Sequence, residues 1–272
     1  MADIDFVKSR QVGVITLDRP AHRNAYTVEM SRQLSDALRE CDDDDHVRCV
    51  VLTGRGDYFS VGLDMSLINA HAGDSAATGA AGGTAPTGRT YPFQLRKPVI
   101  AAINGAAGGF GAAYPLTCDV RIVDRDATIG FTFVRYGLVP EMGATWLLPR
   151  LIGMERALDT LLFGKKMTGA EACQFGIASL AVPKHEVLDT ALAKAERFVR
   201  DVSPLAAAAT KRLAWARFDA GNELLRSIEE DRGNLLRMIA TADCREGSAA
   251  FLEGRAANWP ASSAKDLDSI LA

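Results

Sequence analysis

Short apolar runs and an amphipathic stretch alternate along the first half of the chain. The short runs predict strands over residues 6–10, 12–17, 47–53, 98–103, 120–123 and 127–129. Between them, residues 27–41 place apolar side chains every three or four positions, which is the spacing of an amphipathic helix. The first two strands flank a short turn and predict a hairpin. Because strands alternate with helices, we expect βαβ units and an α/β fold with a largely parallel sheet.

The second half of the chain is expected to be mainly helical from residue 144 on. Helix start signals and amphipathic runs lie at residues 168–171, 203–204, 223–239 and 245–255. We therefore expect an α/β core over residues 1–200, followed by a helical region over residues 201–272.

The segment over residues 70–90 interrupts this pattern with alanine, glycine, serine and threonine. Such a segment has few side chains whose burial could offset the entropy lost on ordering. We expect a mobile loop there. It lies between two candidate site segments, so a lid over the site and a tolerated surface insertion both remain open.

Composition narrows the function classes. The chain has 272 residues, with 31 Lys and Arg against 34 Asp and Glu and a formal net charge of −3. Because it lacks the basic excess that binds a phosphate backbone, nucleic acid is not expected as a partner. The five cysteines are widely spaced and the four histidines lack metal-ligand spacing, so we expect no metal site. Since no apolar signal segment or membrane span is evident, we expect a cytoplasmic protein with no membrane partner.

Two glycine-containing segments follow predicted strands and could present backbone donors. Residues 59–64 read FSVGLD, and residues 104–113 read NGAAGGFGAA. Glycine lets a backbone approach a ligand closely, and free amides at a helix start attract anions or polarised carbonyls. Nucleotide phosphate binding is the rival interpretation, but neither G-x-G-x-x-G nor G-K-[ST] is present.

A third segment, over residues 137–146, carries Glu141 between Pro140 and Met142, ahead of an apolar helix. An apolar setting would raise the pKa of this carboxyl and suit it to work as a general base. The alternative is a first-turn glutamate that stabilises the helix dipole. From spacing alone, the second interpretation is favoured.

Together these segments resemble the enoyl-CoA hydratase/isomerase family, also called the crotonase superfamily. The resemblance covers most of the chain and rests on motifs in the family's order: ITLDRPAHRNA at 15–25, VVLTG at 50–54, FSVGLD at 59–64, the segment 104–119, GLVPE at 137–141, LPRLIG at 148–153 and TGAEA at 168–172. It implies a crotonase-like spiral of ββα units with a C-terminal helical trimerisation region. It also implies a homotrimer or a dimer of trimers that acts on acyl-CoA thioesters, with coenzyme A as part of the substrate and no tightly bound cofactor.

The resemblance implies a set of site residues. By motif position, the backbone amides of Leu63 and Phe110 fall where the family polarises the thioester carbonyl, and an enolate oxygen needs such preorganised donors. The family usually has glycine or a small residue where Phe110 stands, so the ring is expected to reshape the acyl pocket. Arg23 matches a basic position near the CoA phosphates, although an exposed loop arginine is an equal alternative. The remaining expected substrate contacts are Ser60, Val61, Gly62, Asp64, Gly109 and Gly111.

The chain departs from the family pattern at the acids. Typical hydratases hold and activate water with two glutamates, and Ala113 and Phe133 stand at those motif positions. Glu141 matches the single base of some enoyl-CoA isomerases, so with the resemblance in view we favour it as catalytic. We therefore expect a double-bond shift in an enoyl-CoA. The alternatives are a hydratase or another crotonase-type reaction without the glutamate pair, and a non-catalytic acyl-CoA-binding protein.

Overall fold

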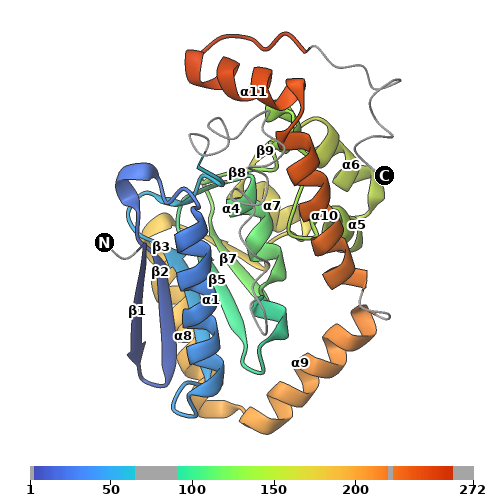
Figure 1. Cartoon of the computed structure of the whole chain (residues 1–272). Helices are drawn as coiled ribbons and strands as arrows, with labels where there is room; N and C mark the ends of the chain where they lie inside the picture. The colour runs from blue at the N-terminus through green and yellow to red at the C-terminus, as the bar shows by residue number, and fades with distance from the viewer. Residues whose placement is uncertain (1–2, 65–90, 220–222, 260–272) are drawn as a thin grey trace.

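The computed structural model describes residues 3–64, 91–219 and 223–259, so the expected loop over residues 70–90 lies outside the described residues. Six strands form the main sheet in the order β1-β2-β3-β5-β7-β10 (Figure 1). They are β1 (Ile4–Ser9), β2 (Val12–Leu17), β3 (Cys49–Gly54), β5 (Val99–Ile103), β7 (Val120–Asp124) and β10 (Leu180–Val182). β1 and β2 pair antiparallel as the predicted hairpin, and every later pairing in this sheet is parallel. The predicted α/β class is confirmed.

The main sheet is buried on both faces because its central strands carry apolar side chains in both directions. In β3, Val50 and Leu52 join the larger core cluster, whereas Cys49 and Val51 join a second cluster with helix α8 (Val187–Asp201). Side chains alternate between the faces of a strand, so a continuous apolar run is what a doubly covered strand requires.

A second, smaller sheet was not predicted from the sequence. Its strands pair in the order β4-β6-β8-β9. They are β4 (Tyr58–Ser60), β6 (Ala106–Gly108), β8 (Thr128–Gly130) and β9 (Lys166–Thr168). Only β8 matched an expected run; three-residue strands are too short to show an alternating pattern. β4 and β6 pair in parallel, and this pairing brings the two glycine-containing segments side by side.

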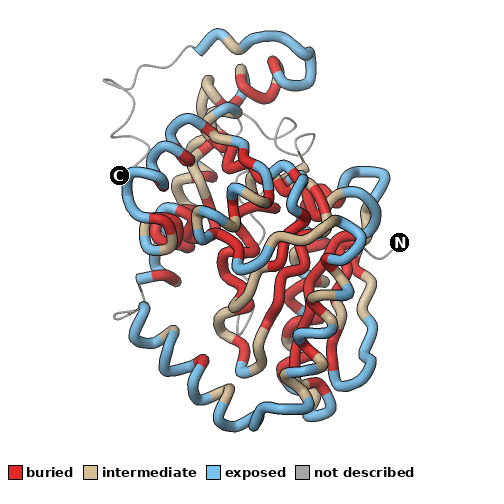
Figure 2. The backbone as a smooth tube through the Cα atoms, turned by 180° about the vertical axis from the view of Figure 1, so that it is seen from behind, coloured by how far each residue is buried: buried red, intermediate tan, exposed pale blue. Residues whose placement is uncertain are grey.

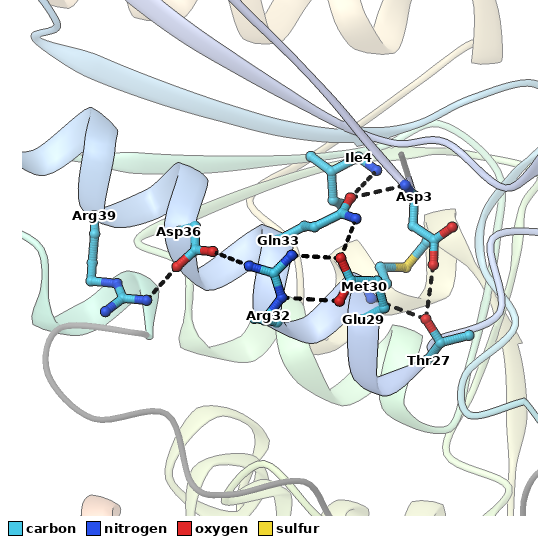
Figure 3. A network of polar contacts seen from close by, with 9 residues as sticks. All are labelled: Asp3, Ile4, Thr27, Glu29, Met30, Arg32, Gln33, Asp36 and Arg39. Atoms are coloured by element: carbon cyan, nitrogen blue, oxygen red, sulfur yellow. Dashed lines mark hydrogen bonds and ion pairs between the residues drawn. The ribbon is translucent and has the colours of Figure 1, made fainter. Parts of the chain in front are cut away.

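Helix α1 (Val28–Asp43) begins where the sequence places it, and a polar network fixes its first turns (Figure 3). The Thr27 hydroxyl accepts a hydrogen bond from the Met30 amide at 3.0 Å and donates one to Asp3 at 2.9 Å. The side-chain oxygen of Gln33 accepts bonds from the amides of Asp3 and Ile4. A threonine N-cap stabilises a helix by about 1 kcal/mol. The network therefore fixes the position of Thr27, which directly follows Tyr26.

The C-terminal half is helical, as expected. A short helix, α4 (Phe110–Ala113), precedes this half. The helices of the C-terminal half are α5 (Ala144–Ile152), α6 (Met154–Leu162), α7 (Gly169–Phe175), α8, α9 (Pro204–Phe218), α10 (Glu223–Ile239) and α11 (Ala242–Glu253). The capping box at Thr168 and Glu171 and the cap at Ser203 are confirmed. α11 begins three residues before the expected position because the Thr241 hydroxyl caps it by accepting from the Cys244 amide.

The arrangement of the last helices matters for the site. α9 reaches away from the sheet and is exposed along most of its length (Figures 1 and 2). It is attached through Asp119, which accepts from Lys211 Nζ at 2.6 Å and from Trp215 Nε1 at 3.0 Å. α10 returns to pack against α5. None of the helices in the described part of the chain is long and apolar enough to cross a membrane.

Candidate active site

The first candidate donor, the Leu63 amide, lies in a short parallel pairing between residues 62–64 and Tyr26. The Tyr26 amide donates to the Gly62 carbonyl at 2.7 Å, and the Asp64 amide donates to the Tyr26 carbonyl at 3.1 Å. In such a pairing, the intervening residue points its amide away from the partner strand. Among the described residues, the Leu63 amide donates to no acceptor, so it is left available for a ligand.

The second candidate donor, the Phe110 amide, opens helix α4. Gly109 is the N-cap of this helix and accepts from the amides of Ala112 and Ala113. An amide in the first turn of a helix has no intrahelical acceptor, and within the described ranges that of Phe110 has no other partner. It therefore matches Leu63 as a free backbone donor.

Gly62 brings the two donors together. A Cβ placed on Gly62 would lie 2.6 Å from the Gly108 carbonyl oxygen and 3.3 Å from the Phe110 amide nitrogen. Gly62 also has φ of +99°, a conformation that favours glycine. Glycine is therefore required here both by the backbone angle and by the close approach, and the free amides lie on adjacent segments.

Glu141 lies in the loop between η4 (Phe133–Tyr136) and α5. The interpretation as a first-turn glutamate is wrong, because Gly143 is the N-cap and Glu141 precedes it. Glu141 is 5% exposed, and its Oε1 has no hydrogen-bond partner in the described structure. Burial raises its pKa to about 8; the negative charge of Asp231 adds to this rise, and Arg232 opposes it. A carboxyl with such a pKa is suited to exchange a proton near neutral pH.

Asp231, on α10, holds the loop that carries Glu141. Its carboxylate accepts from the Gly143 amide at 3.0 Å and from the Thr145 hydroxyl at 3.1 Å. Burial raises the pKa of Asp231 to about 6, although both hydrogen bonds lower it. Asp231 was not predicted from the sequence. A signal was present: Asp231 shares a helical face with the buried residues Leu224, Ile228 and Leu235.

The rings of Tyr26, Phe110 and Tyr114 form one aromatic cluster. Tyr26 and Phe110 have ring centroids 4.0 Å apart, and the Phe110 ring stacks on Tyr114 at 5.4 Å. Burial raises the pKa of the Tyr26 and Tyr91 phenols, so both keep their protons. Tyr26 thus contacts Phe110 through its ring while its backbone pairs with Leu63. Tyr26 could not be predicted from the sequence, since one tyrosine after an Asn-Ala pair has no distinctive pattern.

The other residues expected at the site have different surroundings. Ser60 and Gly111 are buried. The Ser60 hydroxyl donates a hydrogen bond to the Asn24 carbonyl, and a Cβ placed on Gly111 would lie 2.2 Å from the Ser60 carbonyl oxygen. Both shape the backbone and present nothing to solvent. Val61 and Arg23 are exposed, and the Val61 amide donates to the Arg23 carbonyl at 3.2 Å. Both side chains are therefore accessible at the surface.

Asp64 and Gly109 have structural partners. Asp64 lies 3.5 Å from Arg19 in an ion pair. Gly109 has φ of +50° and donates to the Gly130 carbonyl at 2.8 Å.

The two positions where typical hydratases carry glutamates are apolar and buried. Ala113 is fully buried and Phe133 is 3% exposed. The Phe133 ring lies 3.8 Å from a Cβ placed on Gly109, so it packs close to the free amide of Phe110. Neither side chain can exchange a proton. No group of three or more potential metal ligands lies within the described ranges.

Comparison with known proteins places these features in a family. A family model described as enoyl-CoA hydratase/isomerase matches residues 8–262. The chain is 36% identical over 254 residues to a probable enoyl-CoA hydratase of Rhodobacter capsulatus, covering 91% of this chain and 93% of the relative. It is 32% identical over 254 residues to a 1,2-epoxyphenylacetyl-CoA isomerase of Escherichia coli, covering 90% and 93%.

A solved structure agrees with these matches. The structure of Pseudomonas aeruginosa OdaA superposes with a TM-score of 0.82 at 31% identity, and covers 93% of this chain and 99% of that protein. The family model covers most of the chain, and the relatives match over nearly their whole length. The chain belongs to the enoyl-CoA hydratase/isomerase family.

Proposed function

We propose that this enzyme shifts the double bond of an enoyl-CoA thioester, with Glu141 as its single base. The observation that carries the proposal is the state of Glu141. It is buried, its Oε1 has no partner among the described residues, and burial raises its pKa to about 8. An unpartnered buried carboxyl is costly to keep, so a role in proton transfer accounts for it.

The proposed mechanism uses the two free amides and one carboxylate. The amides of Leu63 and Phe110 donate to the thioester carbonyl oxygen and stabilise the charge that develops there. Ionised Glu141 removes a proton from C2 of a 3-enoyl thioester, which gives a dienolate. Glu141 then returns the proton to C4, and the double bond moves between C2 and C3. One carboxylate suffices, because the same proton leaves one carbon and reaches another.

Hydration is the alternative. The name of the Rhodobacter capsulatus relative supports it, whereas the isomerase of Escherichia coli supports a rearrangement. Ala113 and Phe133 weigh against the usual hydration, since it needs two groups to hold and activate water. We therefore favour the isomerase and retain hydration as the competing outcome.

Turnover of two substrates tests the proposal. Wild type, Glu141→Gln and the control Glu155→Gln are each given a 3-enoyl-CoA and a 2-enoyl-CoA of the same chain length. Glu155 is an exposed first-turn residue of α6, so its replacement changes a glutamate outside the site. We expect wild type and Glu155→Gln to form the 2-enoyl product, and Glu141→Gln to lose it by a factor of about 10²–10⁴. Rapid hydration of the 2-enoyl-CoA without isomerisation would overturn the proposal.

A further inference from the structure

A groove runs between helix α9 and the body of the protein, apart from the candidate active site. Its volume is about 720 Å³, and small-molecule sites typically span about 300–1,000 Å³. Within the part of the chain that the structure describes, none of Leu63, Phe110 and Glu141 lines this groove. Its apolar lining includes Leu116, Leu147 and Leu151 from the body and Ala206, Ala214 and Phe218 from α9.

Small side chains leave this groove open. Three of the α9 residues that line it are Ala206, Ala207 and Ala214, and their methyl groups fill little of the space beside the helix. Lys211 and Trp215 tie α9 to the body through their hydrogen bonds to Asp119. The helix is therefore attached beside a space that its own side chains do not occupy.

The groove carries an uncompensated positive charge. Its charged lining residues are Asp119, Lys211 and Arg121, so cations exceed anions by one. Asp119 and Lys211 neutralise each other in an ion pair of 2.6 Å, and Lys211 Nζ also donates to the carbonyls of Pro92 and Lys97. The guanidinium of Arg121 donates only to backbone carbonyls among the described residues and has no acidic partner there.

Arg121 also has donors to spare. Its Nε donates to the Ile177 carbonyl, and its Nη1 donates to the Cys118 carbonyl at 2.7 Å. Nη2 donates to no acceptor in the described structure and does not belong to the fully buried side-chain atoms without a partner, so it remains accessible. Burial lowers the pKa of Arg121, yet a guanidinium keeps its proton in proteins, so the charge persists where water solvates it poorly. A carboxylate is the anion that this planar donor group binds best.

The apolar lining specifies the rest of the ligand. An acidic peptide would bring backbone amides into the groove, and each amide buried without a partner costs free energy. The groove offers few such partners, because Lys211 Nζ and Trp215 Nε1 already donate to Asp119. An alkyl chain needs no polar partner and gains about 25 cal/mol for each Å² of apolar surface that it buries.

We propose that the groove between α9 and the body binds the anion of a medium-chain fatty acid. Its carboxylate accepts hydrogen bonds from Arg121 Nη2, and its alkyl chain lies along the apolar lining. This site is separate from the one that holds the acyl-CoA thioester, and it does not depend on which reaction the enzyme catalyses.

Isothermal titration calorimetry with octanoate and octan-1-ol tests the site, because the two probes share a chain length and differ in the carboxylate. Wild type is compared with Ala214→Phe, which places a ring in the groove, and with the control Ala216→Phe. Both alanines are exposed on α9, but only Ala214 lines the groove. We expect wild type and Ala216→Phe to bind octanoate about tenfold more tightly than octan-1-ol. Ala214→Phe should lose at least tenfold in affinity for octanoate and keep its turnover of enoyl-CoA.

Two replacements of Arg121 test the charge. Arg121→Gln should lose the preference for octanoate, whereas Arg121→Lys keeps a cation and should retain part of it. If Arg121→Gln does not fold, the comparison of Ala214→Phe with Ala216→Phe decides alone.

Three results would overturn the inference: no binding of octanoate to wild type, equal affinity for octanoate and octan-1-ol, or unchanged octanoate binding in Ala214→Phe. The last would place the ligand elsewhere, for example in the acyl site. If wild type binds no octanoate and Ala214→Phe changes the oligomeric state in analytical ultracentrifugation, a second copy of the chain occupies the groove instead.

Discussion

The Tyr26 and Phe110 rings lie 4.0 Å apart between centroids, at an interplanar angle of 41°. Through its backbone, Tyr26 also pairs with the segment that contains Leu63. One residue therefore contacts both of the segments that carry the free amides. Because α1 is capped at Thr27, the next residue along, the position of Tyr26 is fixed by the fold.

Replacement of Phe110 by alanine tests this arrangement. Phe110→Ala removes the contacts with Tyr26 and Tyr114, and truncating a buried phenylalanine typically lowers the free energy of unfolding by about 3–5 kcal/mol. The backbone amide remains, so we expect kcat to fall less than tenfold under conditions where the variant is folded. Chemical denaturation and steady-state kinetics measure the two effects. A loss of 10²-fold or more in the folded variant would show that the ring itself is needed at the reacting centre.

Replacement of Gly62 by alanine should lower kcat more than Phe110→Ala does. The new Cβ would meet the Gly108 carbonyl oxygen at 2.6 Å, so the two donor segments must move apart. Loss of one oxyanion donor typically lowers kcat by about 10²–10³. Gly153→Ala is the matched control, because Gly153 also has positive φ, +80°, but a Cβ there has nothing within 4 Å. If both variants lose activity equally, backbone strain and not donor geometry explains the loss.

The pKa of Glu141 predicts the pH dependence of the reaction. A base must be ionised to accept a proton, and burial raises the pKa of this carboxyl to about 8. We expect kcat/KM to rise with pH through a midpoint near 8 and to level off above it. A pH series of initial rates measures the midpoint. A midpoint near the ordinary value for glutamate would show that Glu141 is not the base in this buried form.

The same pKa predicts a stability effect in Glu141→Gln. The folded protein holds this proton up to about pH 8, whereas an unfolded chain releases it near the ordinary pKa of a glutamate, 4.5. Between these two values the unfolded state binds fewer protons, so the wild type loses stability as pH rises. Glutamine cannot ionise, so we expect the variant's melting temperature to exceed that of wild type increasingly from pH 5 to pH 8. A difference that does not change with pH contradicts the prediction.

The sequence predicted the main sheet except for the three-residue β10, together with α1 and most C-terminal helices, because their apolar runs are long enough to show a period. The small sheet escaped prediction, since a strand such as β4, of only three residues, has no period. The donors at Leu63 and Phe110 came from the family resemblance, and the structure adds that both amides are free within the described residues. The place of Asp231 among apolar residues of α10 gave a hint of its role. Its hydrogen bonds from Gly143 and Thr145 could not be predicted, because these residues are far from Asp231 in the sequence and a local pattern does not reach them.

Asp231 is expected to tune Glu141 through charge, apart from its hydrogen bonds. At the pH where Glu141 titrates, Asp231 is mostly ionised, because its pKa is about 6. Its negative charge opposes ionisation of Glu141, so Asp231→Asn should move the midpoint of the pH–rate profile below 8. Asparagine has one acceptor oxygen in place of two, so the bond with Thr145 must reverse its direction or be lost, and the bond from Gly143 loses its charged acceptor.

Thr145→Val separates the two effects, because it removes one hydrogen bond to Asp231 and keeps the charge. Each variant is expected to lose about 1 kcal/mol or more in the free energy of unfolding. Only Asp231→Asn should shift the pH–rate midpoint downward, and the measurement is a pair of pH series under identical salt. An equal shift in Thr145→Val would assign the effect to loop position. A midpoint that stays near 8 in Asp231→Asn would show that burial alone sets the pKa of Glu141.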